Sequence, residues 1–218
     1  MEKIYQDWFY EKQAQTAIKN LQKKCFEAKY VKDAKAAFNE IMGRVSKNDC
    51  IGLGDSTTLR EIGIIDALEN GGYNFLNPWK EGVTRPESLE VRRKTLTSDI
   101  FLTGTNAVTL DGKLVNIDGL GNRVAGMIFG PQKVVVVVGA NKIVENTEEA
   151  IARIKRISAP VNSRKKIPYH PSSPPCAETG FCSNCKLPGR ICCNTVIIEG
   201  CRQKERTCVI IIGESLGY

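Results

Sequence analysis

The chain has 218 residues, of which 42% are hydrophobic and 25% charged, and this balance excludes disorder and fibrous structure. Its formal net charge is +7, and the excess lies within residues 151–206 without the interleaved aromatic residues that a nucleic-acid surface needs. The start of the sequence lacks a secretion-signal pattern, and no apolar run reaches the roughly 18 residues of a membrane span. We therefore expect a cytoplasmic protein that binds neither nucleic acid nor membrane.

The first part of the chain, within residues 1–48, is expected to be helical. Apolar residues recur at spacings of three and four from Ala14 to Cys25 and again from Ala34 to Ile41. This pattern predicts two amphipathic helices over residues 7–48. Cys25 would then be an ordinary core thiol.

Strands and helices are expected to alternate after residue 48. The expected strands lie at 50–54, 73–77, 99–109, 113–118, 133–140, 195–200 and 207–217, and the expected helices at 55–72, 85–98, 122–130 and 146–157. Five consecutive valines in 133–140 are typical of a parallel strand covered on both faces. The alternation predicts an α/β fold with a mostly parallel sheet flanked by helices.

The sequence GLGDSTT follows the first of these strands and is a candidate anion-binding loop. In a parallel sheet, ligands bind beyond the carboxyl ends of strands, where free backbone N–H groups favour anions. Its glycines permit close backbone approach, and its hydroxyl groups suit a phosphate or carboxylate. A capped turn without any ligand is an equally good interpretation of this loop alone. The candidate binding residues are Gly54, Asp55, Ser56 and Thr57.

Two further polar segments are expected at the same edge of the sheet. One is TGTNAVTLDGKLVNIDGLGNRV, residues 103–124, and the other is GANK, which ends the valine strand. Three such loops would form one polar, anion-attracting pocket. The candidates from these two segments are Thr105, Asn106, Asn116, Asp118, Asn122, Arg123, Asn141 and Lys142.

Five cysteines occur within residues 175–193, in a proline-rich and glycine-rich insertion that spans 158–194. The spacing is Cys176-x5-Cys182-x2-Cys185-x6-Cys192, with Cys193 adjacent. Four soft thiolate ligands suit zinc or an iron-sulfur cluster, and the spacing alone does not choose between them.

Other interpretations of the insertion also remain open. Cys182 and Cys185 could form a redox dithiol, Cys193 could replace Cys192 as a ligand, and His170 could join a zinc site. Whatever metal is bound would also order this segment, because metal binding contributes to its folding.

The run GTNAVTLDGKLVNIDGLGNRVAGMIFGPQKVVVVVGANKIV, the loop GLGDSTT and the closing VIIIGESLGY resemble the lactate-utilisation (LUD) domain family over nearly the whole chain. The resemblance implies a single α/β domain over 1–218 with the fold of ribose-5-phosphate isomerase and CoA transferases. It also implies a place in L-lactate oxidation through an iron-sulfur enzyme complex. On that basis a [4Fe-4S] cluster is favoured over zinc, with other iron-sulfur subunits as partners.

The wider superfamily suggests roles for individual residues. Asn106 falls where related sugar-phosphate isomerases carry a catalytic aspartate, and an amide cannot act as a general base. We therefore expect Asp118 to transfer protons and Lys142 with Arg123 to bind a small anion. The alternative function is a non-catalytic assembly or sensor protein that binds a nucleotide or sugar phosphate and holds structural zinc.

Overall fold

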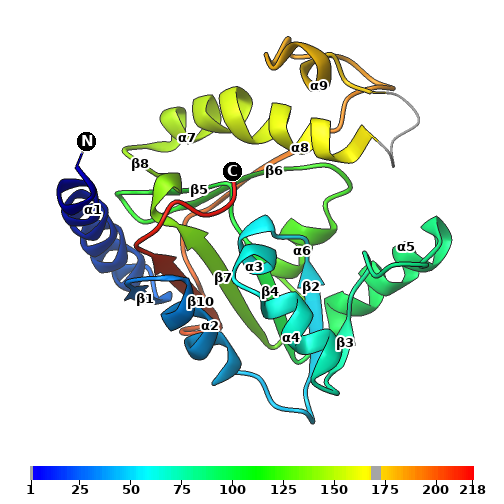
Figure 1. Ribbon diagram of the computed structural model, residues 1–218, viewed down its shortest axis with the longest axis horizontal. Helices are drawn as coiled ribbons and strands as arrows, with labels where there is room; N and C mark the ends of the chain where they lie inside the picture. Colours follow the sequence, from blue (N-terminus) through cyan, green and yellow to red (C-terminus); the bar gives the residue numbers. More distant parts are fainter. Residues whose placement is uncertain (1, 168–172) are drawn as a thin grey trace.

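The computed structural model describes residues 2–167 and 173–218 (Figure 1). The main sheet has six parallel strands in the order β1 (Glu27–Val31), β10 (Thr207–Ile212), β7 (Lys133–Gly139), β4 (Ile100–Gly104), β2 (Cys50–Gly54) and β3 (Asn74–Leu76). A smaller sheet has the order β8 (Ile143–Val144), β5 (Ala107–Thr109), β6 (Leu114–Asp118) and β9 (Asn194–Ile198). The mostly parallel sheet confirms the predicted fold class.

The central strand β7 is buried on both faces, as its valine run predicts. Val134, Val136 and Val138 pack with α1 (Lys3–Lys23), α6 (Asn122–Ile128) and the smaller sheet. Val135 and Val137 pack with α2 (Ala34–Met42), α3 (Thr57–Glu61) and α4 (Ile64–Asn70). Successive side chains of a strand point to opposite faces, so one apolar run supplies both halves of the core.

The N-terminal region differs from the two helices expected over 7–48. α1 ends at Lys23, and residues 27–31 form β1 at the edge of the main sheet before α2 begins. Cys25, expected in the core, is exposed and has a φ of +66°. This left-handed conformation ends the helix at a position usually filled by glycine or asparagine.

The helices after residue 84 also differ in extent from the predicted helices. They are α5 (Arg85–Lys94) with the 3₁₀ turn η1 (Thr95–Thr97), the 3₁₀ turn η2 (Ala140–Lys142), α7 (Thr147–Arg153), the π-helical turn η3 (Ile154–Ser158), α8 (Ala159–Lys166) and α9 (Cys176–Thr179). The insertion expected from residue 158 is therefore helical as far as Lys166. α7, η3 and α8 follow one another without a gap, and Pro160 stands directly after the π-helical turn in this continuous helical stretch.

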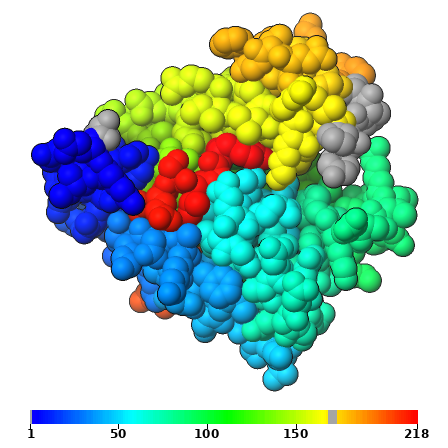
Figure 2. All heavy atoms as spheres, viewed as in Figure 1, coloured from blue at the N-terminus to red at the C-terminus, as the bar shows by residue number. Residues whose placement is uncertain are grey.

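The carboxyl ends of β2, β4 and β7 lie together, because these strands are parallel and in register: Gly54 pairs with Thr103, and Gly104 with Val137. β5 and β6 follow β4 directly and extend from this edge (Figure 1). Residues 213–218 cross the same face between α8 and α3 (Figure 2). Within residues 2–167 and 173–218, no helix combines the length and apolar character that a membrane span requires.

Candidate functional site

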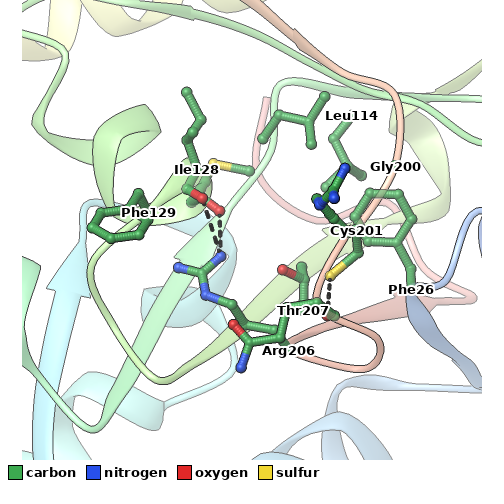
Figure 3. A pocket seen from close by; sticks show the side chains of 12 residues that line it. Phe26, Leu114, Ile128, Phe129, Gly200, Cys201, Arg206 and Thr207 are labelled. Atoms are coloured by element: carbon green, nitrogen blue, oxygen red, sulfur yellow. Dashed lines mark hydrogen bonds between the residues drawn. The ribbon is translucent and has the colours of Figure 1, made fainter.

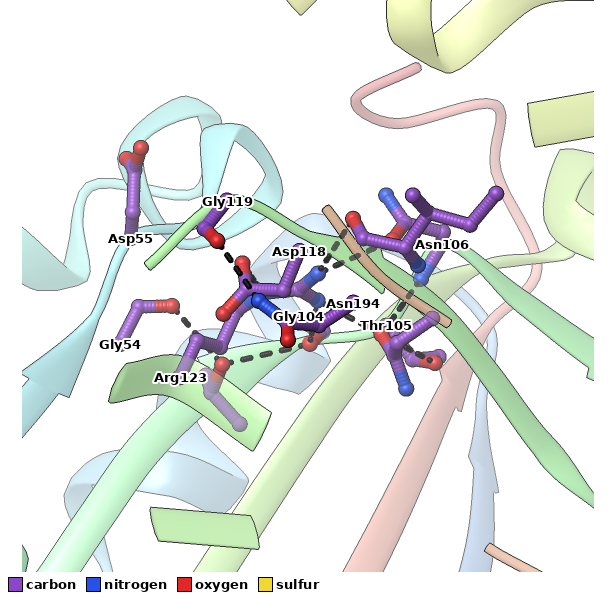
Figure 4. A network of polar contacts seen from close by, with 12 residues as sticks. Gly54, Asp55, Gly104, Thr105, Asn106, Asp118, Gly119, Arg123 and Asn194 are labelled. Carbon is purple, nitrogen blue, oxygen red and sulfur yellow. Dashed lines mark hydrogen bonds and ion pairs between the residues drawn. The ribbon is translucent and has the colours of Figure 1, made fainter. Parts of the chain in front are cut away.

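Arg123, in the first turn of α6, is the centre of a polar network at the carboxyl edge of the sheet (Figure 4). Its guanidinium donates to Asn116 Oδ1 at 2.6 Å, Asn106 Oδ1 at 3.0 Å and the Gly104 carbonyl at 3.2 Å. It also donates to the Ile117 carbonyl at 3.3 Å and to Asp118 Oδ1 at 3.4 Å. All three of its nitrogen atoms are therefore engaged within the protein. We conclude that Arg123 braces the network.

The two asparagines of this network tie β4–β5 to β6. Asn106 Oδ1 accepts from the Ile117 backbone N–H at 3.1 Å, and Asn116 Oδ1 accepts from the Asn106 backbone N–H at 3.2 Å. The Thr105 hydroxyl lies 3.2 Å from Asn116 Oδ1. Asn106 thus occupies a cross-bracing position, in keeping with an amide that performs no proton transfer.

Asp118 ends β6 and is the carboxylate nearest to this network. One oxygen, Oδ1, faces Arg123, whereas Oδ2 is shielded from solvent and has no hydrogen-bond partner among the described residues. Figure 4 shows Asp118 beside Arg123, with Gly54 and Asp55 at the neighbouring strand end. A buried oxygen without a donor is uncommon in proteins, and it marks Asp118 as a functional candidate.

Contacts with α3 and α8 hold the loop between β2 and α3. The Ser56 hydroxyl caps α3 by accepting from the Leu59 N–H at 3.2 Å, and Asp55 pairs with Lys166 at 3.6 Å. Lys165 Nζ donates to the Thr57 hydroxyl at 3.3 Å. A Cβ atom on Gly54 would lie 2.4 Å from the Phe101 ring, so this glycine is required by packing in the core.

Lys142 is buried, with 4% of its surface exposed, and its ammonium donates to the Thr58 hydroxyl at 2.9 Å. Burial, and next the positive charge of Arg153, lower the pKa of Lys142 to about 7. Gly217 covers it, because a Cβ at Gly217 would lie 2.7 Å from Lys142 Nζ. Lys142 therefore joins two of the predicted loops but is enclosed by the chain.

Contacts of residues 216–217 also engage the side chain of Asn141, which is partly exposed. Asn141 Oδ1 accepts from the Leu216 N–H at 3.2 Å, and its amide nitrogen donates to the Gly217 carbonyl at 3.3 Å. The Gly217 N–H donates to Glu61 at 2.6 Å. The sequence pattern gave no indication of this cover, because these contacts join residues far apart in the chain. Asn122, the last of the predicted candidates at this edge, is the first residue of α6.

The four predicted metal ligands, Cys176, Cys182, Cys185 and Cys192, line one cavity of about 230 Å³ between the cysteine segment and α7–α8. Burial, and next the nearby Cys176, Cys182 and Cys185 thiols, raise the pKa of the Cys192 thiol to about 11, with Arg190 opposing the rise. Each of the other three thiols is therefore close enough to act on the charge of Cys192. Cys193, by contrast, is exposed. His170 lies outside the described residues.

The cysteine segment has an open arrangement around this cavity. In the described ranges, no three cysteine, histidine or acidic side chains are near enough to one another to hold a metal ion. Arg190 braces the loop by donating to the Cys185 carbonyl at 2.7 Å and the Cys192 carbonyl at 2.6 Å. The donor set suits a thiophilic metal, and the loop would have to contract for all four sulfur atoms to reach it.

The cysteine segment is joined directly to the strand that carries Asp118. The Cys193 N–H donates to the Asp118 carbonyl at 2.9 Å, and Asn194, the first residue of β9, pairs with Asp118 in the antiparallel ladder. The Asn194 amide also donates to the Gly119 carbonyl at 2.6 Å. Cys192 therefore lies two residues from the partner of Asp118. The cysteine segment and the sheet edge are therefore direct neighbours in the structure.

A larger cavity, of about 510 Å³, lies at the amino-terminal end of β10 and contains none of the predicted site residues (Figure 3). Its lining is mainly apolar and includes Phe26, Leu114 and Phe129. The Arg206 guanidinium beside it donates to the carbonyls of residues 126, 127, 128 and 131. Arg206 is therefore engaged within the protein, and Cys201 and Arg202 are the other ionisable residues that line this cavity.

Comparison with known proteins identifies relatives of the fold. A family model described as the LUD domain matches residues 14–212. A search of curated proteins finds no match. Among solved structures, a DUF162 family protein from Deinococcus radiodurans matches with a TM-score of 0.51 and 12% sequence identity. The match covers 94% of this chain and 97% of that chain, and at this identity it shows the fold alone.

Proposed function

The chain belongs to the LUD domain family, and from this membership we propose that it is an iron-sulfur component of 2-hydroxy acid oxidation, with L-lactate as the substrate. The convergence of the four cysteines on one cavity carries this proposal. Cys176, Cys182, Cys185 and Cys192 would hold a [4Fe-4S] cluster, which supplies one-electron transfer when bound. All nine cysteines are free thiols, which favours a reducing, cytoplasmic location.

The strand pair β6–β9 supports a functional link between the metal centre and the sheet edge. Oxidation of a 2-hydroxy acid to a 2-oxo acid releases two electrons and two protons. Asp118 would accept the hydroxyl proton, because Oδ2 has no other partner among the described residues. Arg123 would orient Asp118 through the ion pair between them. The Cα–H bond would break with its hydrogen and electron pair passing to a two-electron acceptor on a partner subunit. The iron-sulfur subunits that family membership suggests as partners would then carry the electrons one at a time.

Metal analysis tests this proposal directly. Protein purified without oxygen should contain iron and acid-labile sulfide in equal amounts and should show a broad visible absorption. Substituting Cys182 and Cys185 together by serine should remove both elements. The matched control is Cys25→Ser, because Cys25 is exposed and does not line the cavity. Loss of iron from the control as well would contradict the assignment of ligands.

Asp118→Asn tests the role of the carboxylate. In an assay that contains the electron-accepting partners, this substitution should abolish turnover and leave substrate affinity largely intact, because an amide oxygen still accepts a hydrogen bond but takes up no proton. Turnover that is unaffected by the change would exclude Asp118 as the proton acceptor.

The alternative function, a zinc-holding assembly or sensor protein that binds a nucleotide or sugar phosphate, is favoured by one observation. Arg123, Asn141 and Lys142 are engaged in contacts within the chain, which leaves few groups free for chemistry. Stoichiometric zinc without colour would support this alternative. Protein that takes up neither metal under anaerobic conditions would refute both metal assignments.

A further inference from the structure

Arg92, in α5, is a half-buried cation that the sequence pattern did not distinguish from its neighbours. Its Nε atom is shielded from solvent and has no hydrogen-bond partner among the described residues. The guanidinium carbon lies 5.1 Å from the centre of the Trp79 ring, and this stacking fixes the plane of the group. Arg92 is therefore in contact with an aromatic side chain while its shielded Nε has no acceptor among the described residues.

Two carboxylates from other elements lie near enough for their charges to act on Arg92 without pairing with it. The charges of Asp55 and Asp118 both act on the guanidinium, whose pKa is nevertheless lowered, chiefly by burial. In the described part of the chain, Asp118 forms its ion pair with Arg123 and Asp55 forms its own with Lys166. No ion pair within 4.0 Å joins either carboxylate to Arg92 there.

The two unpartnered atoms have opposite requirements. Arg92 Nε needs an acceptor, and Asp118 Oδ2 needs a donor. Leaving such atoms buried and unpaired costs folding free energy, and the charge of Asp118 reaches Arg92, so the two atoms together indicate a ligand. Arg123 cannot take this role, because its nitrogen atoms already donate to five acceptors within the chain.

We propose that Arg92 binds the carboxylate of a 2-hydroxy acid whose adjacent hydroxyl group donates to Asp118 Oδ2. The assignment rests on the proposed function for the substrate class. A guanidinium binds a carboxylate through two parallel hydrogen bonds, and a 2-hydroxy acid carries the required acceptor and donor on neighbouring carbon atoms. Arg85 adds a second positive charge near Arg92, which favours an anion there.

Trp79 gives a direct readout, because it lies against Arg92. The other tryptophan, Trp8, is 59% exposed on α1, so Trp8→Phe leaves Trp79 as the reporter. In this background, the purified full-length protein is titrated with L-lactate, propanoate and inorganic phosphate, and binding is followed by Trp79 fluorescence and by calorimetry. L-lactate should bind most tightly, since propanoate lacks the hydroxyl group and phosphate has a different shape.

Arg92→Leu should weaken L-lactate binding at least about tenfold, because a charge-assisted pair is lost. Arg93→Leu is the matched control, since Arg93 is exposed and adjacent, and it should leave affinity unchanged. If Arg92→Leu fails to fold, Arg92→Lys serves instead; it keeps the charge, loses the planar fork and should still weaken binding.

Three results would overturn this assignment: no saturable response to L-lactate, equal affinity for L-lactate and propanoate, or equal losses in the Arg92 and Arg93 variants. Tight phosphate binding without L-lactate binding would also overturn it. The readout does not depend on iron. Zinc-containing protein that binds L-lactate through Arg92 would therefore retain this site while refuting the iron-sulfur proposal.

Discussion

Lys142→Met should stabilise the protein at and below neutral pH. The native state holds this ammonium in an environment where burial, and next the charge of Arg153, lower its pKa from 10.5 to about 7. A shift of this size corresponds to a cost of about 5 kcal/mol for keeping the charged form in the folded protein. Methionine has a similar length and carries no charge to desolvate.

The direction of the pH dependence follows from the lowered pKa of Lys142 in the folded state. Above pH 10.5 the lysine is neutral in both states and the cost is absent; as the pH falls it grows, and it is complete below about pH 7. Wild-type stability should therefore rise with pH across this window relative to the variant. The variant also loses the hydrogen bond to Thr58, which reduces the stabilisation by about 1 kcal/mol. The free energy of unfolding of Lys142→Met should therefore exceed that of wild type by about 3 to 4 kcal/mol at pH 7.

Urea unfolding of both proteins at several pH values between about 7 and 10.5 measures this effect. The difference between wild type and variant removes the contributions of groups that titrate in both. Lys35→Met, at an exposed position of α2, serves as the control and should leave the pH dependence unchanged. If the free energies of unfolding of wild type and Lys142→Met changed in parallel with pH, the reasoning would be refuted.

Three other perturbations follow from the packing and the polar network. Arg123→Leu should destabilise the protein by about 3 to 5 kcal/mol in urea unfolding, because it leaves buried acceptors unpaired, whereas the exposed Arg93→Leu should change stability by less than about 1 kcal/mol. Gly54→Ala should cost about 1 to 3 kcal/mol through its clash with Phe101, and Phe101→Leu in the same chain should recover part of that loss; an additive double variant would argue against the clash. Removing the metal with a chelator should speed amide exchange within residues 173–194, and unchanged exchange would show that the segment folds without metal.

The sequence predicts a strand well when the apolar pattern of the strand matches the burial of its two faces. β7 is apolar throughout and lies between two parallel neighbours with both faces covered, so its pattern is unambiguous. β1 was missed because it is an edge strand of mixed composition and because Cys25, in place of glycine, ends the preceding helix. Nothing local marks that boundary in the sequence.

Part of the candidate site was also predictable from the sequence. The polar residues that follow β2, β4 and β7 were expected to meet because the ends of parallel strands meet, and Lys142 does contact Thr58. Arg92 was not found, since it stands beside Arg93 in a charged helix and only the fold distinguishes them. The cover formed by residues 216–217 was missed because its contacts cross the whole chain.

The position of β10 has a consequence for folding. This strand comes last along the chain but lies between β1 and β7, with Glu27 opposite Cys208. Until residues 207–212 leave the ribosome, β1 has no neighbour and one edge of the valine strand stays open, so synthesis passes through a stage with an unpaired, strongly apolar edge. Contacts of such long sequence separation form slowly and expose intermediates to aggregation. Chaperone dependence during synthesis should therefore be greatest immediately before these residues emerge.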